Sequence, residues 1–241
     1  MVCLAPLAFS QDVTLTLVNG GQYSMDGIYV GAYNATLNNS PTPIICDDFA
    51  DEVYQNESWT ASITQAASIT NTTPGLKWST GGDLAFWGIS NSNIVQGYDA
   101  MLYLASQMLP LSLQNGQNSQ TIGLYAYAIW AIFDPTAVES YIYAHDANPG
   151  NTWNLIAQLA QSAVNGNYTK NEFAGWEVLT PQCSGGGGGG TDPCSQGVPQ
   201  EFFIYVPEGG SALMYLLLAG VSCMGAFLFR SRSPRTRSET L

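Results

Sequence analysis

The sequence predicts an α+β fold, with N-terminal strands, a central helical segment, C-terminal strands and then a C-terminal transmembrane helix. Residues 13–68 and 173–206 show short alternating runs rich in Tyr, Val and Ile. Residues 82–166 instead repeat apolar side chains at helical spacing, and residues 211–229 form an uncharged apolar run. Strands, then helices, then strands favour one domain with a shared core.

The first strand is expected at Val13–Val18, where apolar and polar residues alternate before the turn sequence Asn19-Gly20-Gly21. The other expected strands share short runs of β-branched and aromatic residues, and they are Gly27–Tyr33, Pro43–Cys46, Ser58–Ile63, Trp176–Leu179 and Glu201–Val206.

Three helices are expected in the centre of the chain. They are Tyr98–Leu109, Ser119–Phe133 and Thr152–Val164. The second helix should stop before Pro135, because proline disrupts a helix interior. His145, the only histidine, is expected in a loop after a helix.

The C-terminal end combines a short motif, an apolar run and a basic tail. The motif is Val206-Pro207-Glu208-Gly209-Gly210, and the run Ser211–Phe229 would span about 28 Å as a helix, close to the ~30 Å hydrocarbon core. The basic residues that follow are Arg230, Arg232, Arg235 and Arg237. By the positive-inside rule, the tail would stay in the cytoplasm and the preceding chain would be exported.

This end resembles the PEP-CTERM sorting signal, although Gly209 stands where that family commonly has a second proline. The resemblance implies recognition by an exosortase-type enzyme in the inner membrane, cleavage near Pro207, and release to the cell surface or extracellular matrix. A plain single-pass membrane anchor is the alternative.

Three segments follow from these features. Residues 1–10 resemble the end of a signal peptide, because an apolar stretch precedes the small-x-small sequence Ala8-Phe9-Ser10. Residues 11–205 form the expected exported domain, and residues 206–241 form the sorting signal.

The composition excludes some partners. The formal net charge is −12, and Lys77 and Lys170 are the only basic residues between residues 11 and 205 apart from His145. Nucleic-acid binding needs a basic patch, which these residues cannot supply. A weakly charged, Asn/Thr-rich and aromatic-rich domain suits export and contact with extracellular polysaccharide, whose sugar rings pack on aromatic faces. Core packing is the alternative role for the aromatic residues.

The cysteines suit an oxidising compartment. Cys183 and Cys194 flank the Gly185–Gly190 run, which would let them form a disulfide worth about 2–3 kcal/mol. Cys46 is then left without an expected partner.

Cys46 also carries a second resemblance. Ile45-Cys46-Asp47 and the later Ala128-Ile129-Trp130 resemble the cysteine step and the Gln-x-x-apolar-Trp helix of Cys-Gln thioester adhesin domains. The resemblance implies a related fold. It does not imply the thioester, because Ala126 occupies the position of the glutamine, and neither Gln114 nor Gln120 is in register.

The densest polar cluster is Asp47, Asp48, Asp51 and Glu52. Several carboxylates would suit calcium, although the spacing is not that of an EF-hand. A glycan hydrolase would use Asp47 or Asp48 with a partner such as Asp83, Asp99 or Asp134, because paired carboxylates flank the bond. A solvated turn, with Asp47 or Asp48 capping a helix, is the third interpretation.

The sequence therefore predicts an exported, non-enzymatic surface or matrix protein with an adhesive or structural role. No catalytic residue and no cofactor is expected, apart from the candidate calcium. The alternatives are a secreted or periplasmic glycan hydrolase and a calcium-stabilised binding module.

Overall fold

The computed structural model describes residues 12–182 and 199–207. The chain divides into two compact units, Met1–Tyr205 and Val206–Leu241, and every described strand and helix belongs to the first unit. Its strands are β1 (Asp12–Asn19), β2 (Tyr23–Met25), β3 (Ile28–Val30), β4 (Ala32–Leu37), β5 (Ser40–Cys46), β6 (Ser58–Gln65), β7 (Trp176–Pro181) and β8 (Phe202–Tyr205). Its helices are α1 (Ile94–Ser112), α2 (Ser119–Ala131), α3 (Pro135–His145) and α4 (Pro149–Val164), with the short 3₁₀ helices η1 (Ala66–Ser68), η2 (Leu84–Trp87) and η3 (Lys170–Phe173).

Six strands close into a barrel in the order β1-β4-β5-β8-β7-β6. All six pairings are antiparallel. Closure gives every barrel strand two neighbours and so leaves no unpaired edge. The last strand in the sequence, β8, fills the place between β5 and β7, while β2 and β3 form a separate hairpin.

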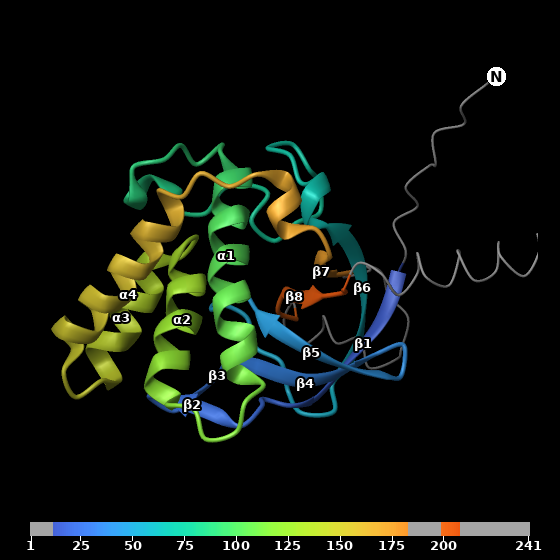
Figure 1. Ribbon diagram of the computed structural model, residues 1–241, viewed down its shortest axis with the longest axis horizontal. Coiled ribbons are helices and arrows are strands. Elements are labelled where there is room, and N and C mark those ends of the chain that lie inside the picture. The colour runs from blue at the N-terminus through green and yellow to red at the C-terminus, as the bar shows by residue number, and fades with distance from the viewer. Residues whose placement is uncertain (1–11, 183–198, 208–241) are drawn as a thin grey trace, which may run out of the picture. The chain divides into compact units, whose positions relative to one another are not determined.

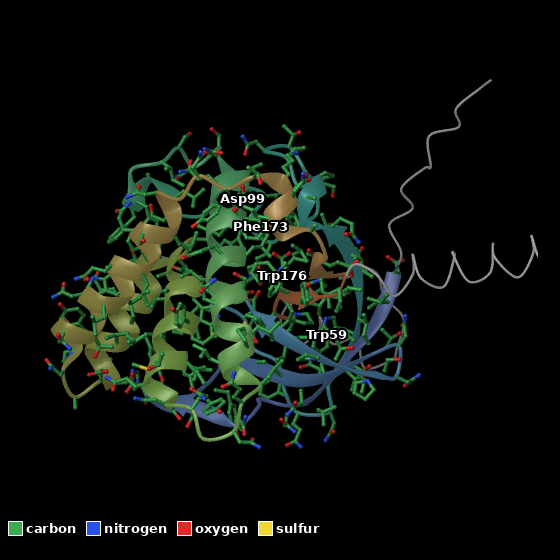
Figure 2. All side chains as sticks on the ribbon, in the orientation of Figure 1. Trp59, Asp99, Phe173 and Trp176 are labelled. Carbon is green, nitrogen blue, oxygen red and sulfur yellow. The ribbon has the colours of Figure 1, made fainter. Side chains whose placement is uncertain are left out.

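Side-chain alternation produces the barrel interior. Along β1, Val13, Leu15 and Leu17 are buried while the residues between them are more exposed, as expected for a strand with one face on a core. Trp59 of β6 packs against Phe202 of β8 with ring centroids 6.0 Å apart. Figure 2 labels Trp59 of β6 and Trp176 of β7 among the barrel strands.

The four α-helices gather beside the barrel (Figure 1). Helix α2 is central, because it contacts α1, α3, α4 and both strands of the β2–β3 hairpin. Trp130 of α2 is buried, and its Nε1 donates a hydrogen bond to the carbonyl of Cys46 at 3.0 Å. This bond fixes α2 against the end of β5.

The α+β prediction is wrong as a description of the architecture. The strands expected before and after the helices do exist, but they share one closed six-stranded barrel accompanied by four helices. Period-two alternation shows which face of a strand is buried. It does not show that β1 pairs with β6, or that β8 enters between β5 and β7.

The predicted transmembrane helix is also not supported. Within residues 12–182 and 199–207, no helix is both long enough and apolar enough to cross a membrane. Helix α1 is the longest of them with 19 residues, but it carries Gln96, Asp99 and Gln107. The expected span, residues 211–229, lies outside the described residues.

Helix α3 is not among the helices expected from the sequence. Pro135 ends the preceding helical pattern, but it also occupies the first turn of α3, where its missing N–H has no helical acceptor to lose. Asp134 caps α3 by accepting a hydrogen bond from the Ala137 amide at 3.3 Å. The prediction that His145 lies in a loop is therefore wrong, because it is the last residue of α3.

Candidate functional site

A group of charged side chains gathers where β5 ends and β8 begins. It consists of Asp47, Asp48, Asp51, Glu201 and Lys77, and is called the buried acidic cluster. β5 pairs with β8 through Cys46 and Phe202, which brings the following Asp47 beside the preceding Glu201. The Asp47 amide donates to the Glu201 carbonyl at 3.3 Å. Asp47, Asp48 and Glu201 are all fully buried.

Glu201 is held by three donors from distant parts of the chain. Its Oε1 accepts from the Tyr98 hydroxyl at 2.6 Å, and its Oε2 accepts from the Lys77 amide at 3.0 Å and from the Thr180 hydroxyl. These donors satisfy both oxygens of the buried Glu201 carboxyl.

The Asp47 carboxyl differs from that of Glu201 in its hydrogen bonding. Neither of its carboxyl oxygens has a hydrogen-bond partner among the described residues. Burial, followed by the nearby charge of Glu201, raises the pKa of Asp47 well above its ordinary value. Asp47 is therefore favoured as a neutral, protonated carboxyl.

Asp48 and Asp51 contact the same ammonium. Lys77 Nζ lies 2.9 Å from Asp48 Oδ2 and also contacts Asp51 Oδ2. Asp48 Oδ1 accepts from the amides of Ala50 and Asp51, at 2.9 and 3.4 Å. Burial raises the pKa of Asp48 to about 6, against the opposing effect of Lys77. Burial lowers the pKa of Lys77, but the hydrogen bond to Asp51 and the charge contact with Asp48 outweigh burial and leave that pKa raised.

Cys46 carries a free and buried thiol. Its Sγ donates to the Asp48 carbonyl at 2.9 Å, and burial followed by the charges of Asp48 and Asp47 raises its pKa well above the ordinary value. A protonated, inaccessible thiol is a weak nucleophile.

The structure brings together Cys46 and Trp130, the two residues of the thioester-domain resemblance that are present in this sequence, through the hydrogen bond from the Trp130 indole to the Cys46 carbonyl. Ala126 lies one turn before Trp130 in α2 and is buried. It has no carboxamide to serve as an acyl donor. Gln120 lies in the first turn of α2, and Gln114 lies before that helix. The related fold and the family both stay predictions.

The candidate hydrolytic carboxylates lie on different elements, although the Asp83 amide donates to the carbonyl of Phe133, the residue before Asp134, at 2.8 Å. Asp134 caps α3, Asp83 precedes η2, and Asp99 lies on α1 beside Phe173 of η3 (Figure 2). Asp47 and Asp48 are buried, so a glycan in solution does not reach them in this conformation. An acid and a base on opposite sides of a glycosidic bond would both need to touch the substrate.

The candidate calcium ligands also separate. Glu52 turns away from the cluster and accepts from the Tyr54 hydroxyl at 2.8 Å. Within the described parts of the chain, no group of three or more His, Cys, Asp and Glu side chains is arranged to hold a metal ion. The ammonium of Lys77 occupies the place beside Asp48 and Asp51.

A second feature, which the sequence did not single out, is a pocket of about 290 Å³ around Tyr29. It is called the Tyr29 pocket. Its lining comes from β1, the β2–β3 hairpin, β4, the loop after β5 and the segment before β8, and includes Asn19, Tyr33, Glu52, Gln55 and Gln200. Among the residues that the structure describes, the lining contains no Lys, Arg or His.

The ring of Tyr29 is held open to solvent at this pocket. Its side chain is 58% exposed, and a Cβ placed at Gly20 would collide with its ring, so the ring lies directly on the Gly20 backbone. The Tyr29 carbonyl accepts from the Tyr33 hydroxyl at 3.0 Å. The sequence signal was the Asn19-Gly20-Gly21 turn, which indicates a turn but not which ring packs on it.

Some predicted site residues lie outside the described ranges. They are Cys183, Cys194, Glu208, Gly209, Gly210, Arg230 and Arg232, so the disulfide and most of the sorting motif stay predictions. Val206 and Pro207 directly follow β8.

Comparisons with known proteins identify no relative. No protein-family model, curated protein or solved structure matches this chain. The PEP-CTERM and thioester-domain resemblances therefore rest on the quoted motifs alone.

Proposed function

We propose that this chain is an exported, non-enzymatic adhesive or structural protein of the cell surface or extracellular matrix, and that it binds a neutral sugar residue of an extracellular polysaccharide in the Tyr29 pocket. The observation that carries the proposal is the exposed Tyr29 ring at a pocket lined by amides and one carboxylate. Sugar rings offer apolar C–H faces to an aromatic side chain and hydroxyls to polar groups.

The polar groups of the pocket suit hydroxyls. Asn19 Oδ1 accepts from Gly21 and from Asn34, which leaves the Asn19 amide protons for a ligand. Gln200 Nε2 donates to the carbonyls of Asp48 and Asp51, which leaves its carbonyl oxygen as an acceptor. A pocket with a few fixed polar groups around an aromatic surface is typical of small-ligand sites.

Charge supports the choice of a neutral sugar. Glu52 is the charged residue of the lining, and the chain carries a formal net charge of −12. Anionic sugars such as uronates would be repelled, because no basic side chain of the lining offsets them.

A non-enzymatic role agrees with the burial of Asp47 and Asp48. The glycan-hydrolase alternative would require one or both of them to reach substrate. Export and exosortase-type processing stay part of the proposal on the strength of the Val206-Pro207-Glu208 motif and the weakly charged composition.

The proposal is tested by profiling the purified protein on an array of neutral and anionic oligosaccharides. We expect neutral glycans to be retained, and Tyr29→Ala to lose that signal. Tyr143→Ala is the matched control, because Tyr143 is a 55% exposed tyrosine on α3 outside the pocket. Equal binding by both variants, or release of shortened glycan products, would contradict the proposal.

A further inference from the structure

Lys77 occupies an unusual place for a lysine in this chain. Its side chain is 24% exposed, and its Nζ lies between Asp48 and Asp51. The backbone at Lys77 is fixed, because its amide donates to Glu201 and the next residue, Trp78, stacks on Phe133 with centroids 5.2 Å apart. The ammonium is therefore held against the two carboxylates by rigid neighbours.

Asp48 is fixed from its other side. Its Oδ1 receives two backbone amides, and its carbonyl receives the Cys46 thiol and the Gln200 amide. Its fully buried Oδ2 lies 2.9 Å from Lys77 Nζ, yet it has no partner with hydrogen-bond geometry. Lys77 Nζ and Asp48 Oδ2 are thus in contact, but the angles between the two groups are not those of an ordinary charged hydrogen bond.

We propose that Lys77 Nζ and the Asp48 side chain form an intramolecular isopeptide bond, with Asp51 as the proton carrier. Asp48 is the acceptor because its side chain is fully buried, whereas that of Asp51 is 24% exposed. Asp51 contacts the same Nζ and is placed to take a proton from it. The inference does not depend on the Tyr29 pocket or on sugar binding.

The reaction is a condensation. The Lys77 ammonium passes one proton to the Asp51 carboxylate, and the resulting amine attacks Asp48 Cγ. The Nζ–Cγ bond forms and one Cγ–O bond breaks. The attacked carboxyl is the protonated form of Asp48, so the departing oxygen carries that carboxyl proton and takes one ammonium proton from nitrogen to leave as water. The other ammonium proton, held by Asp51, is released to solvent, and Asp51 returns to its carboxylate form. No oxidant, reductant or other reactant is required.

The raised pKa of Lys77 opposes this step, because it favours the ammonium, and so Asp51 must take the proton before the attack. Positioning and the state of Asp48 favour the step. Prior positioning of two reacting groups is equivalent to effective concentrations of about 10⁵–10⁸ M in well-oriented systems. Burial raises the pKa of Asp48 to about 6, which increases the share of the protonated carboxyl that an amine can attack. The bond would join the residues after β5 to the segment before η2 and so enclose all of β6 in a covalent loop.

The test is the intact mass of the folded full chain after reduction of any disulfide, followed by peptide mapping. We expect the wild-type mass to be lower by one water than the sequence mass, and Lys77→Arg to restore the full mass. Lys170→Arg is the matched control, because Lys170 is exposed and should leave the water loss in place. Since an aspartyl succinimide also loses one water, mapping must recover a single species that contains both Asp48 and Lys77.

A second variant tests the role of Asp51. Asp51→Asn should fold with an unchanged circular dichroism spectrum but keep the full mass, because the proton carrier is lost. Folded wild-type protein at its full sequence mass would overturn the proposal whether or not any variant folds. Water loss without the linked peptide, or a link from Lys77 to Asp51, would overturn it as well.

Discussion

At the scale of single residues, burial decides the chemistry of the carboxyl groups. The sequence shows that residues 47–52 are rich in acids, and a solvated turn, calcium binding and catalysis are all compatible with that pattern. Which of these roles the acids can take depends on contacts with residues from remote segments, namely Lys77, Tyr98, Thr180 and Glu201. Local spacing does not report such partners, so the burial of Asp47 and Asp48 could not be predicted.

Asp99 should make the stability of the protein depend on pH. Burial raises its pKa to about 6 from the unfolded value of 3.8, against the charge of Lys170. The folded state therefore binds this proton more tightly, and the stabilisation is present below about pH 4 and is lost as the pH rises to about 6. Asp99→Asn should flatten this part of the curve of unfolding free energy against pH. An unchanged slope in urea titrations would contradict this prediction.

Trp130→Phe should destabilise the protein by about 1–3 kcal/mol, because the buried Cys46 carbonyl would lose its donor. Trp59→Phe is the matched control, since the Trp59 indole N–H is buried without a partner among the described residues and no hydrogen bond would be lost. Urea denaturation measures both variants. Equal losses would show that the Trp130 hydrogen bond contributes nothing specific.

At the scale of elements, the sequence locates periodic segments well and their partners poorly. The expected helices overlap α1, α2 and α4, and the expected strands overlap β1 and β5–β8. Helix α3 is not predicted, because Pro135 marks the end of the preceding helical pattern. Proline also suits the first turn of a helix, and Pro135 occupies that place in α3. Gly31 separates β3 from β4 within the run expected as a single strand.

The contact between α2 and β2 depends on Gly123. A Cβ at this position would collide with the Met25 side chain, so Gly123→Ala should cost about 1–3 kcal/mol through overpacking. Gly150→Ala in α4 serves as the control. A Cβ placed there would meet the Tyr143 hydroxyl oxygen only at 4.0 Å, so that change should be neutral or slightly stabilising. Thermal melts of both variants test the prediction, which fails if Gly123→Ala melts like the wild type.

At the scale of the whole molecule, neither the barrel closure nor the Tyr29 pocket could be predicted from the sequence, and the reason is the same for both. Both join segments that are far apart in the chain, such as β1 with β6, or Asn19 with Gln200. Composition argues against nucleic acid as a partner and favours contact with polysaccharide, and both stay predictions. The structure adds which aromatic residue is open to solvent beside polar groups.

Metal removal should leave the melting temperature unchanged. Lys77 already places a positive charge beside Asp48 and Asp51, and the described residues form no cage for a cation. Melting curves with excess EDTA and with added calcium should therefore coincide. A lower melting temperature in EDTA that calcium restores would favour the calcium-stabilised binding module instead.

The most direct test of the central claim is a calorimetric titration with a neutral oligosaccharide, carried out on the wild type, Tyr29→Ala and Tyr143→Ala. The account predicts that Tyr29→Ala weakens binding by at least about tenfold, that Tyr143→Ala binds like the wild type, and that the glycan is recovered intact. Unchanged affinity in Tyr29→Ala, or cleavage of the glycan during the titration, would contradict it.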